Sequence, residues 1–236
     1  MTEDAGSILL WIIIPYLALG FFIVGHWWRY RRDQFQWTTR STQILDRRVL
    51  GWASPAFHFG ILAAAGGHIV GLLIPESLTE AVGISDHTYH WFAFAVGGVA
   101  GIITLVGFFG LLYRRFTSVR VRRTTTRLDM LTYGLLTLMI LLGCYMTAWN
   151  GLVAEPFNYR DSIGEWWRSI FMLRPDIDAV QAAPLSYQLH AITAWAFWAA
   201  FPFTRLVHVW SVPLAYIGRP YILYRRRYNT QSSRIR

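Results

Sequence analysis

Five stretches of apolar residues, separated by polar connections, dominate the sequence and predict five membrane-spanning helices. A bilayer core of about 30 Å requires about 20 mostly apolar residues in a helix, and each stretch has that length. They cover approximately residues 8–28, 52–74, 91–113, 128–149 and 187–210. Tryptophan and tyrosine collect at their ends, as expected where amphipathic rings meet lipid headgroups. The fold class expected is an all-α, multi-pass protein of the cell membrane, with one domain over residues 1–236.

The arginines predict the orientation of these spans. All 22 basic residues are arginine, and 18 of them fall in the two connections after spans one and three or in the tail 211–236. The opposite side carries only Arg160, Arg168 and Arg174, with ten acidic residues. Because positive residues stay cytoplasmic, we expect the amino terminus outside and the tail in the cytoplasm.

Composition narrows the possible functions. Charged residues make up 15% and hydrophobic residues 54% of the chain, which indicates a lipid-facing surface. The net charge of +9 lies in clusters between the apolar stretches, so a nucleic-acid partner is not expected. The single cysteine, Cys144, excludes a disulfide, a structural zinc site and an iron–sulfur cluster of the chain's own. No C-x-x-C-H motif is present, so any haem is held without covalent attachment. The acidic start of the chain predicts no cleaved signal peptide.

The outward connection over residues 150–186 is longer than a turn requires. Its apolar residues around Trp166 and Phe171 predict a short helix at the membrane interface. Its acidic end, residues 175–178, is expected in water.

Four histidines lie inside the predicted spans: His58 and His68 in the second, His190 and His208 in the fifth. Ionisable residues within a membrane are costly and mark functional sites by default. A hydrogen bond to a neighbouring helix explains one such histidine, but two on each of two helices favour a shared function. His26, at the inner end of the first span, is expected to be an interfacial residue.

The second and fifth spans cross the membrane in opposite directions, which sorts the four histidines into two pairs. His58 and His208 lie toward the inner side, and His68 and His190 toward the outer side. Two neutral imidazoles on opposite faces of a porphyrin give a six-coordinate iron, which carries electrons and does not activate oxygen. We therefore predict a cytochrome b with two haems between helices 2 and 5.

Small residues of the second span fit this prediction. Gly60, residues 63–67 and Gly71 remove bulk where a flat macrocycle would approach; close helix packing is the alternative. Gly97 and Gly101 in the third span are attributed to helix packing alone.

The heights of the histidines fit less well. At 1.5 Å per residue, His58 and His68 are about 15 Å apart along the axis, but His190 and His208 are about 27 Å apart. Helix tilt, a kink at Pro202 or tilted haems must absorb the difference.

The sequence resembles the gamma subunit of respiratory nitrate reductase, the NarI family of dihaem cytochromes b. The resemblance covers nearly the whole chain and is weakest over residues 150–186. It is carried by residues 29–47, Ala53–Leu62, Gly67–His68, Arg120–Thr126, Leu189–His190 and Phe201–Pro213.

The resemblance implies a direction for the electrons. In this family the pair matching His68 and His190 binds the distal haem iron, and the pair matching His58 and His208 binds the proximal haem iron. Quinol is oxidised beside the distal haem near the outer face. Electrons then pass to an iron–sulfur beta subunit and a molybdenum alpha subunit in the cytoplasm, where nitrate is reduced, so turnover charges the membrane.

One departure concerns the quinol site. Better-known members of the family carry a lysine between the second and third spans that contributes to the quinol site, but this chain contains no lysine and reads Asp86-His-Thr-Tyr-His-Trp91 there. Our hypothesis is that His87, Tyr89 or His90 takes over as hydrogen-bond partner or proton acceptor, because histidine exchanges protons near neutral pH. The alternative is that these are solvated loop histidines.

Three arginines are candidates for the propionates of the proximal haem. Arg114 and Arg115 end the third span, and Arg205 lies one turn from His208; each offers charge-assisted bonds. The remaining inner arginines are read as positive-inside residues or as part of the surface that docks the cytoplasmic subunits.

Two other functions remain open at this stage. A sibling cytochrome b could feed a heterodisulfide or sulfite reductase complex, although the motifs around Thr124 and His208 favour nitrate reductase. A haem-free membrane anchor with structural histidines is the rival from another class.

Overall fold

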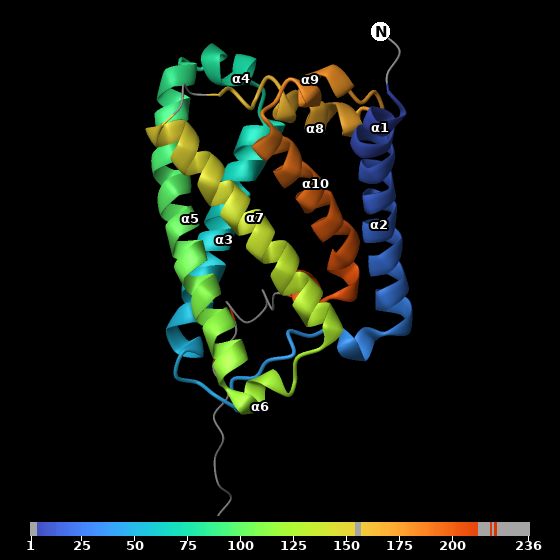
Figure 1. Ribbon diagram of the computed structural model, residues 1–236, viewed down its shortest axis with the longest axis vertical. Coiled ribbons are helices and arrows are strands. Elements are labelled where there is room, and N and C mark those ends of the chain that lie inside the picture. Colours follow the sequence, from blue (N-terminus) through green and yellow to red (C-terminus); the bar gives the residue numbers. More distant parts are fainter. Residues whose placement is uncertain (1–3, 154–156, 212–217, 219, 221–236) are drawn as a thin grey trace, which may run out of the picture.

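The computed structural model describes residues 4–153 and 157–211, with 218 and 220, and all regular structure in this part of the chain is helical. Four helices are long and apolar enough to cross a membrane (Figure 1): Ala5–Arg32, Leu50–Leu73, Asp86–Thr117 and Arg127–Leu152. Their most apolar stretches have mean hydropathies between 1.6 and 2.5, and at most 22% of each stretch is buried within the protein. Apolar side chains therefore cover the outside of the bundle, as lipid contact requires. Four of the five predicted spans are confirmed.

The first span is built in three sections. The α-helical turn α1 (Ala5–Ile8) leads into a π-helical turn, η1 (Leu9–Ile13), and then into α2 (Ile14–Arg32). Pro15 stands at the start of α2 and cannot donate a backbone hydrogen bond to the preceding turn, so the helix widens there.

The second and third spans, α3 (Leu50–Leu73) and α5 (Asp86–Thr117), pack along each other where glycine replaces a side chain. A Cβ atom at Gly60 would lie 2.5 Å from the hydroxyl oxygen of Thr104, and one at Gly107 would meet the backbone of α3. Close approach of the two backbones is therefore possible only without side chains at these positions.

Only one glycine of the pair Gly97 and Gly101, which was expected to serve helix packing, faces a neighbouring helix among the described residues. A Cβ atom at Gly101 would lie 3.3 Å from the sulfur of Cys144 on α7 (Arg127–Leu152), so this glycine does face a neighbouring helix. A Cβ atom at Gly97 would have no neighbour within 4 Å among the described residues.

Short elements close both ends of the bundle (Figure 1). One end, beside the amino terminus, carries three helices: α4 (Glu76–Ala81), α8 (Ile163–Phe171) and α9 (Ile177–Gln181). The other end carries η2 (Gln34–Gln36) and α6 (Val119–Arg122).

The helix expected near Trp166 and Phe171 is confirmed as α8. Trp166 is fully buried against Trp11 and Trp195, and its indole nitrogen donates to the backbone oxygen of Trp11 at 3.1 Å.

The fifth expected span is not one continuous helix. Its α-helical part, α10 (Leu185–Ala200), is followed by two 3-10 segments, η3 (Phe201–Phe203) and η4 (Arg205–Ser211). Pro202 has no N–H to donate and its ring crowds the carbonyl four residues earlier, so the helix stops there. In the described part of the chain the span expected over residues 187–210 is thus an α-helix that ends at Ala200 and continues as 3-10 turns, and its crossing of the membrane stays a prediction.

Arg29 of the first span stabilises this break. Its guanidinium group is buried and donates to the backbone oxygens of Pro202 and Thr204, at 2.5 and 2.9 Å. Carbonyl groups released by the end of α10 thus find a donor from another span, which an apolar surrounding demands. The tail expected over residues 211–236 lies almost entirely outside the described residues, and the orientation stays a prediction.

Candidate haem and quinol sites

The four histidines meet as the two expected pairs. The ring centroids of His68 and His190 are 6.0 Å apart, with the ring planes inclined by 20°. The ring centroids of His58 and His208 are also 6.0 Å apart, with an inclination of 69°. Both pairs form although their members are unequally spaced in sequence, and α10 ends at Ala200, so one continuous α-helix does not connect His190 and His208.

Three of the four imidazoles are held in one tautomer. The Nδ1 atoms of His58, His68 and His208 each donate to a backbone oxygen at 2.7 Å. The acceptors are Ser54 and Ala64, one turn earlier on α3, and Arg205. A hydrogen bond at Nδ1 leaves Nε2 as the lone-pair nitrogen, which is the arrangement typical of metal-ligating histidine.

His190 differs from the other three histidines. Its Nδ1 is buried and has no hydrogen-bond partner among the described residues. A buried polar atom without a partner is uncommon and calls for an explanation.

The spacing of both pairs fits a haem iron. Two metal–nitrogen bonds of about 2 Å, plus about 1 Å from each nitrogen to its ring centre, place the centroids about 6 Å apart. The observed 6.0 Å in each pair equals that separation. Among the described residues no three histidine, cysteine or acidic side chains converge as a metal site, so the histidines meet only in twos.

The helices that carry the histidines leave this space between them. α3 packs along α5, whereas α10 packs against α2 and α7, so α3 and α10 form none of the main helix contacts of the described residues. Beside His68, a Cβ atom at Gly66 or Gly67 would meet no described atom within 4 Å. By contrast, one at Gly71 would collide with the side chain of Tyr159. The stripe of small residues therefore leaves an open face near His68, packs on α5 at Gly60 and contacts Tyr159 of the connection 150–186 at Gly71.

The three candidate quinol residues occupy the first turns of α5, but they face different partners. Trp91 donates through its indole nitrogen to Nε2 of His87 at 3.0 Å, on the exposed surface. The hydroxyl oxygen of Tyr89 lies 3.2 Å from that of Tyr159, and Tyr89 and His90 line a small cavity with Asp86. The structure thus brings Tyr89 and His90 together and leaves His87 apart.

Tyr159 connects this cavity to the outer histidine pair. Its ring stacks on Tyr187, with centroids 6.5 Å apart, and Tyr187 lies one turn before His190. On the other side Tyr159 packs against Gly71, one turn after His68. Burial and the hydrogen bond to Tyr89 raise the pKa of Tyr159 far above its ordinary value, so its hydroxyl stays neutral.

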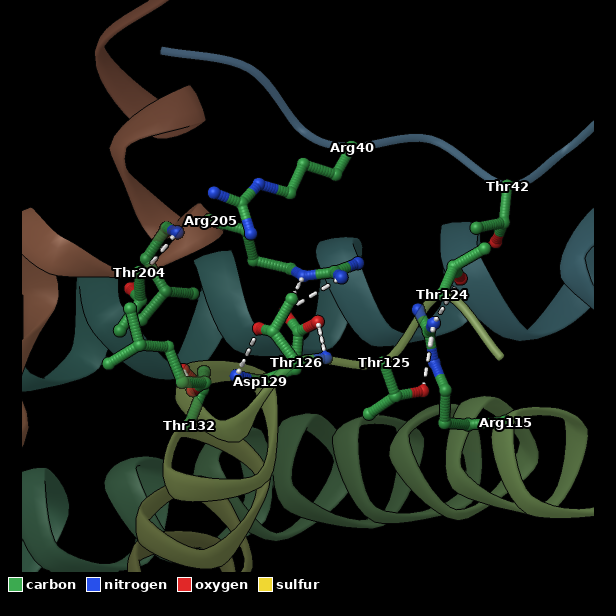
Figure 2. Close-up of polar contacts among 12 residues, drawn as sticks. Arg40, Thr42, Arg115, Thr124, Thr125, Thr126, Asp129, Thr132, Thr204 and Arg205 are labelled. Atoms are coloured by element: carbon green, nitrogen blue, oxygen red, sulfur yellow. Dashed lines mark hydrogen bonds and ion pairs between the residues drawn. The ribbon is translucent and has the colours of Figure 1, made fainter. Parts of the chain in front are cut away.

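The three arginines that are candidates for haem propionates already form hydrogen bonds or an ion pair with other residues of the chain. Arg114 donates to the backbone oxygens of Thr42 and Asp46. These bonds hold the connection between α2 and α3 against the end of α5. Arg115 donates to the backbone oxygen of Val121 at 3.3 Å, with the hydroxyls of Thr124 and Thr125 nearby (Figure 2). A role with haem propionates stays a prediction for these residues and would require such bonds to rearrange.

Arg205 forms an ion pair with Asp129, which is buried in the first turn of α7 (Figure 2). Its Nε and Nη2 atoms each lie 2.8 Å from one carboxylate oxygen of Asp129. The other carboxylate oxygen accepts the backbone N–H of Thr126 at 2.9 Å and caps α7. Since the backbone oxygen of Arg205 accepts from His208, the ion pair fixes the segment that carries this histidine.

Sequence reasoning missed Asp129, Tyr159 and Arg160 as site residues. Asp129 carried a usable signal, because it is an acidic side chain inside a predicted span. Arg160 is one of only three arginines on the acidic side of the chain. Tyr159 carried no signal, because its position depends on the folding of the outer connection.

Comparison of the sequence with known proteins places this chain in a family. A family model described as nitrate reductase gamma subunit matches residues 7–227. The nitrate reductase gamma chain of Bacillus subtilis is 42% identical over 219 residues, which cover 93% of this chain and 98% of that protein. The respiratory nitrate reductase 1 gamma chain of Escherichia coli is 34% identical over 217 residues, 92% of this chain and 96% of that protein.

A longer relative has a higher identity. The nitrate reductase-like protein NarX of Mycobacterium tuberculosis is 46% identical over 227 residues, which cover 96% of this chain. The chain spans about a third of that protein, since the match covers 35% of it. These similarities confirm the resemblance expected from the sequence and favour it over a heterodisulfide or sulfite reductase partner.

Proposed function

Because the chain belongs to the nitrate reductase gamma subunit family, we propose that it is a dihaem cytochrome b that oxidises quinol and passes electrons to the other nitrate reductase subunits. The protein is a multi-pass membrane protein, and the proposal concerns what its polar residues do inside the membrane. Quinol is the electron donor, and an iron–sulfur beta subunit and a molybdenum alpha subunit in the cytoplasm are the acceptors.

The equal spacing of the two histidine pairs is the observation that carries this proposal. Two pairs with the same centroid separation of 6.0 Å, on helices that do not pack closely, match the needs of two bis-histidine haems. A haem held in this way supplies reversible one-electron transfer. His58 with His208 and His68 with His190 would each hold one haem through two imidazoles, and such a haem would supply electron transfer and not oxygen activation.

The histidines contribute more than ligation. Backbone acceptors at Nδ1 of His58, His68 and His208 orient the rings and make the opposite nitrogen more basic. His190 has no such acceptor among the described residues, so its nitrogen is the less basic ligand. This difference supports unequal redox potentials for the outer and inner sites.

The proposed quinol site adjoins the outer pair. Tyr89 supplies a hydroxyl group and His90 a proton acceptor beside the cavity near Tyr159. His87 is the weaker candidate because its Nε2 already accepts a bond from Trp91. A proton taken up by His90 would leave toward the outer face while the electron moves inward, so each turnover would add to the proton motive force.

A reduced-minus-oxidised spectrum of the purified chain tests the proposal. Two b-type redox steps are expected. Replacing His68 or His190 by alanine should abolish one step, and replacing His58 or His208 should abolish the other. His26→Gln is the matched control, since His26 bonds Phe22 and Trp210 and is in neither pair. Absence of b-type absorption in the wild type would refute the proposal and favour a haem-free anchor.

A further inference from the structure

Arg160 is a buried cation that uses less than half of its hydrogen-bonding capacity, two of five N–H donors. Its side chain is 1% exposed, and its Nη2 atom donates to the backbone oxygen of Ile74 and the hydroxyl of Thr79, at 3.2 and 3.0 Å. Its Nε and Nη1 atoms are buried and have no hydrogen-bond partner among the described residues. Buried donors without acceptors are costly, so Nε and Nη1 are available to donate to an oxygen atom of a ligand.

The charge of Arg160 is also without a direct counterion. No carboxylate of the described residues lies within 4.0 Å of its guanidinium group, whereas Arg205 has Asp129. The guanidinium instead rests over the ring of Tyr89, 4.1 Å from its centroid, which provides only a modest compensation. An oxygen atom with partial or full negative charge is therefore the ligand best suited to this position.

Arg160 also lines a cavity, and the ring of Tyr159 at this cavity stacks on Tyr187, one turn before His190. This cavity of about 30 Å³ is lined by Asp86, Tyr89, His90, Phe157, Tyr159 and Arg160, among others. A cavity of this volume has room for one or two water molecules, and it is far smaller than the ~150 Å³ of a cavity that binds benzene, so a six-membered ring does not fit inside it. A larger ligand would have to place one oxygen in the cavity and keep its ring outside.

We propose that Arg160 binds one oxygen of the quinone ring through Nε and Nη1, and so fixes the end of the ring nearest the outer face. This inference rests on the proposed function, because it adds a binding residue to the same quinol site. The hydroxyl groups of Tyr89 and Tyr159 lie at the same cavity and supply further polar contacts. A permanent cation favours the oxygen of a quinone or of a deprotonated quinol over a purely apolar occupant.

Quinone binding to the detergent-solubilised full chain is the measurement that tests this. Menadione is the probe, and quenching of tryptophan fluorescence reports its dissociation constant. Arg160→Gln should raise that constant at least about tenfold, because a hydrogen bond to a charged group is lost. Arg160→Lys should be intermediate, since lysine keeps the charge but lacks the planar fork of donors.

Two control variants separate binding from folding. Arg174→Gln removes an exposed arginine of the same outer connection and should leave the dissociation constant unchanged. Thr79→Val removes one hydrogen bond of Nη2 and leaves Nε and Nη1 of Arg160 in place. It therefore shows what a less firmly held guanidinium group does to binding when the proposed donors are still present. A change in Thr79→Val as large as in Arg160→Gln would contradict the proposal.

Wild-type affinity in a folded Arg160→Gln variant would also overturn the inference, and the cavity would then hold only water. If Arg160→Gln does not fold, wild-type affinity in Arg160→Lys decides the matter in the same way. The measurement does not depend on haem. A wild type that binds menadione but shows no b-type absorption would refute the proposed function and leave the role of Arg160 standing.

Discussion

Arg205 and Asp129, 76 residues apart in sequence, form a buried ion pair in which two guanidinium nitrogens lie 2.8 Å from the same carboxylate oxygen (Figure 2). The pair joins the last segment of the bundle to the start of α7. α10 has already ended before Arg205, and the described chain continues there in 3-10 turns. The ion pair therefore holds this segment against α7.

Replacing Asp129 by asparagine should destabilise the protein strongly. Arg205 would keep a largely buried charge without a partner, and breaking a buried pair in this way costs about 3–5 kcal/mol. Thermal unfolding in detergent measures the effect. Asp33→Asn is the control, because Asp33 pairs with Arg29 only at 4.0 Å and is partly exposed; it should cost no more than about 1 kcal/mol. Equal losses in the two variants would contradict the assignment.

Replacing Arg29 by glutamine should destabilise the segment that follows α10, around residues 201–204. The backbone oxygens of Pro202 and Thr204 would lose their donor, at about 1–3 kcal/mol for each buried acceptor left unpaired. Unfolding temperature and proteolysis near residues 201–204 report the change. Arg31→Gln, at an exposed position two residues further along the same helix, should behave as wild type. An unchanged unfolding temperature in the Arg29 variant would refute this role.

Replacing Gly107 by alanine should push α3 and α5 apart. The added Cβ atom would lie 2.9 Å from the backbone oxygen of Ala53, which cannot move aside as a flexible side chain would. Overpacking of this kind costs about 1–3 kcal/mol. Gly97→Ala on the same helix meets no described atom within 4 Å and should leave the unfolding temperature unchanged or slightly raised. The reverse order would show that the helices pack elsewhere.

The outer carboxylates predict a pH dependence of stability. Burial and the neighbouring Glu76 raise the pKa of Asp161 above its ordinary value, and Asn158 donates to both side chains. Because the folded state holds this proton more tightly than the unfolded state, the stabilising contribution is present at low pH. It is lost as pH rises from the ordinary value through the raised one.

Unfolding temperatures measured between about pH 3.5 and 7 check this prediction. Asp161→Asn should remove the decline attributable to this group, and Glu76→Gln should reduce it by deleting the neighbouring charge. A wild type and Asp161→Asn variant with parallel pH profiles would refute the prediction.

Much of the bundle could be predicted from the sequence because membrane helices are encoded locally. Each of the first four spans is a continuous apolar run, and the structure has a helix over each of them. The grouping of His58 with His208 and of His68 with His190 also followed from the alternating direction of consecutive spans. Pro202 was visible in the sequence, but nothing local shows that Arg29, 173 residues away, donates to the backbone oxygen of Pro202 beyond the end of α10.

The sequence by itself determined the number of apolar segments, the sorting of the arginines and which histidines pair. These features depend only on local composition and on the order of the spans. Only the tertiary structure decided that both pairs have the same 6.0 Å spacing, that Arg205 pairs with Asp129, and that Arg160 keeps unused donors beside the outer pair. The physical reason is that a buried polar group takes its partners from whatever segments fold around it, and no local pattern records that choice.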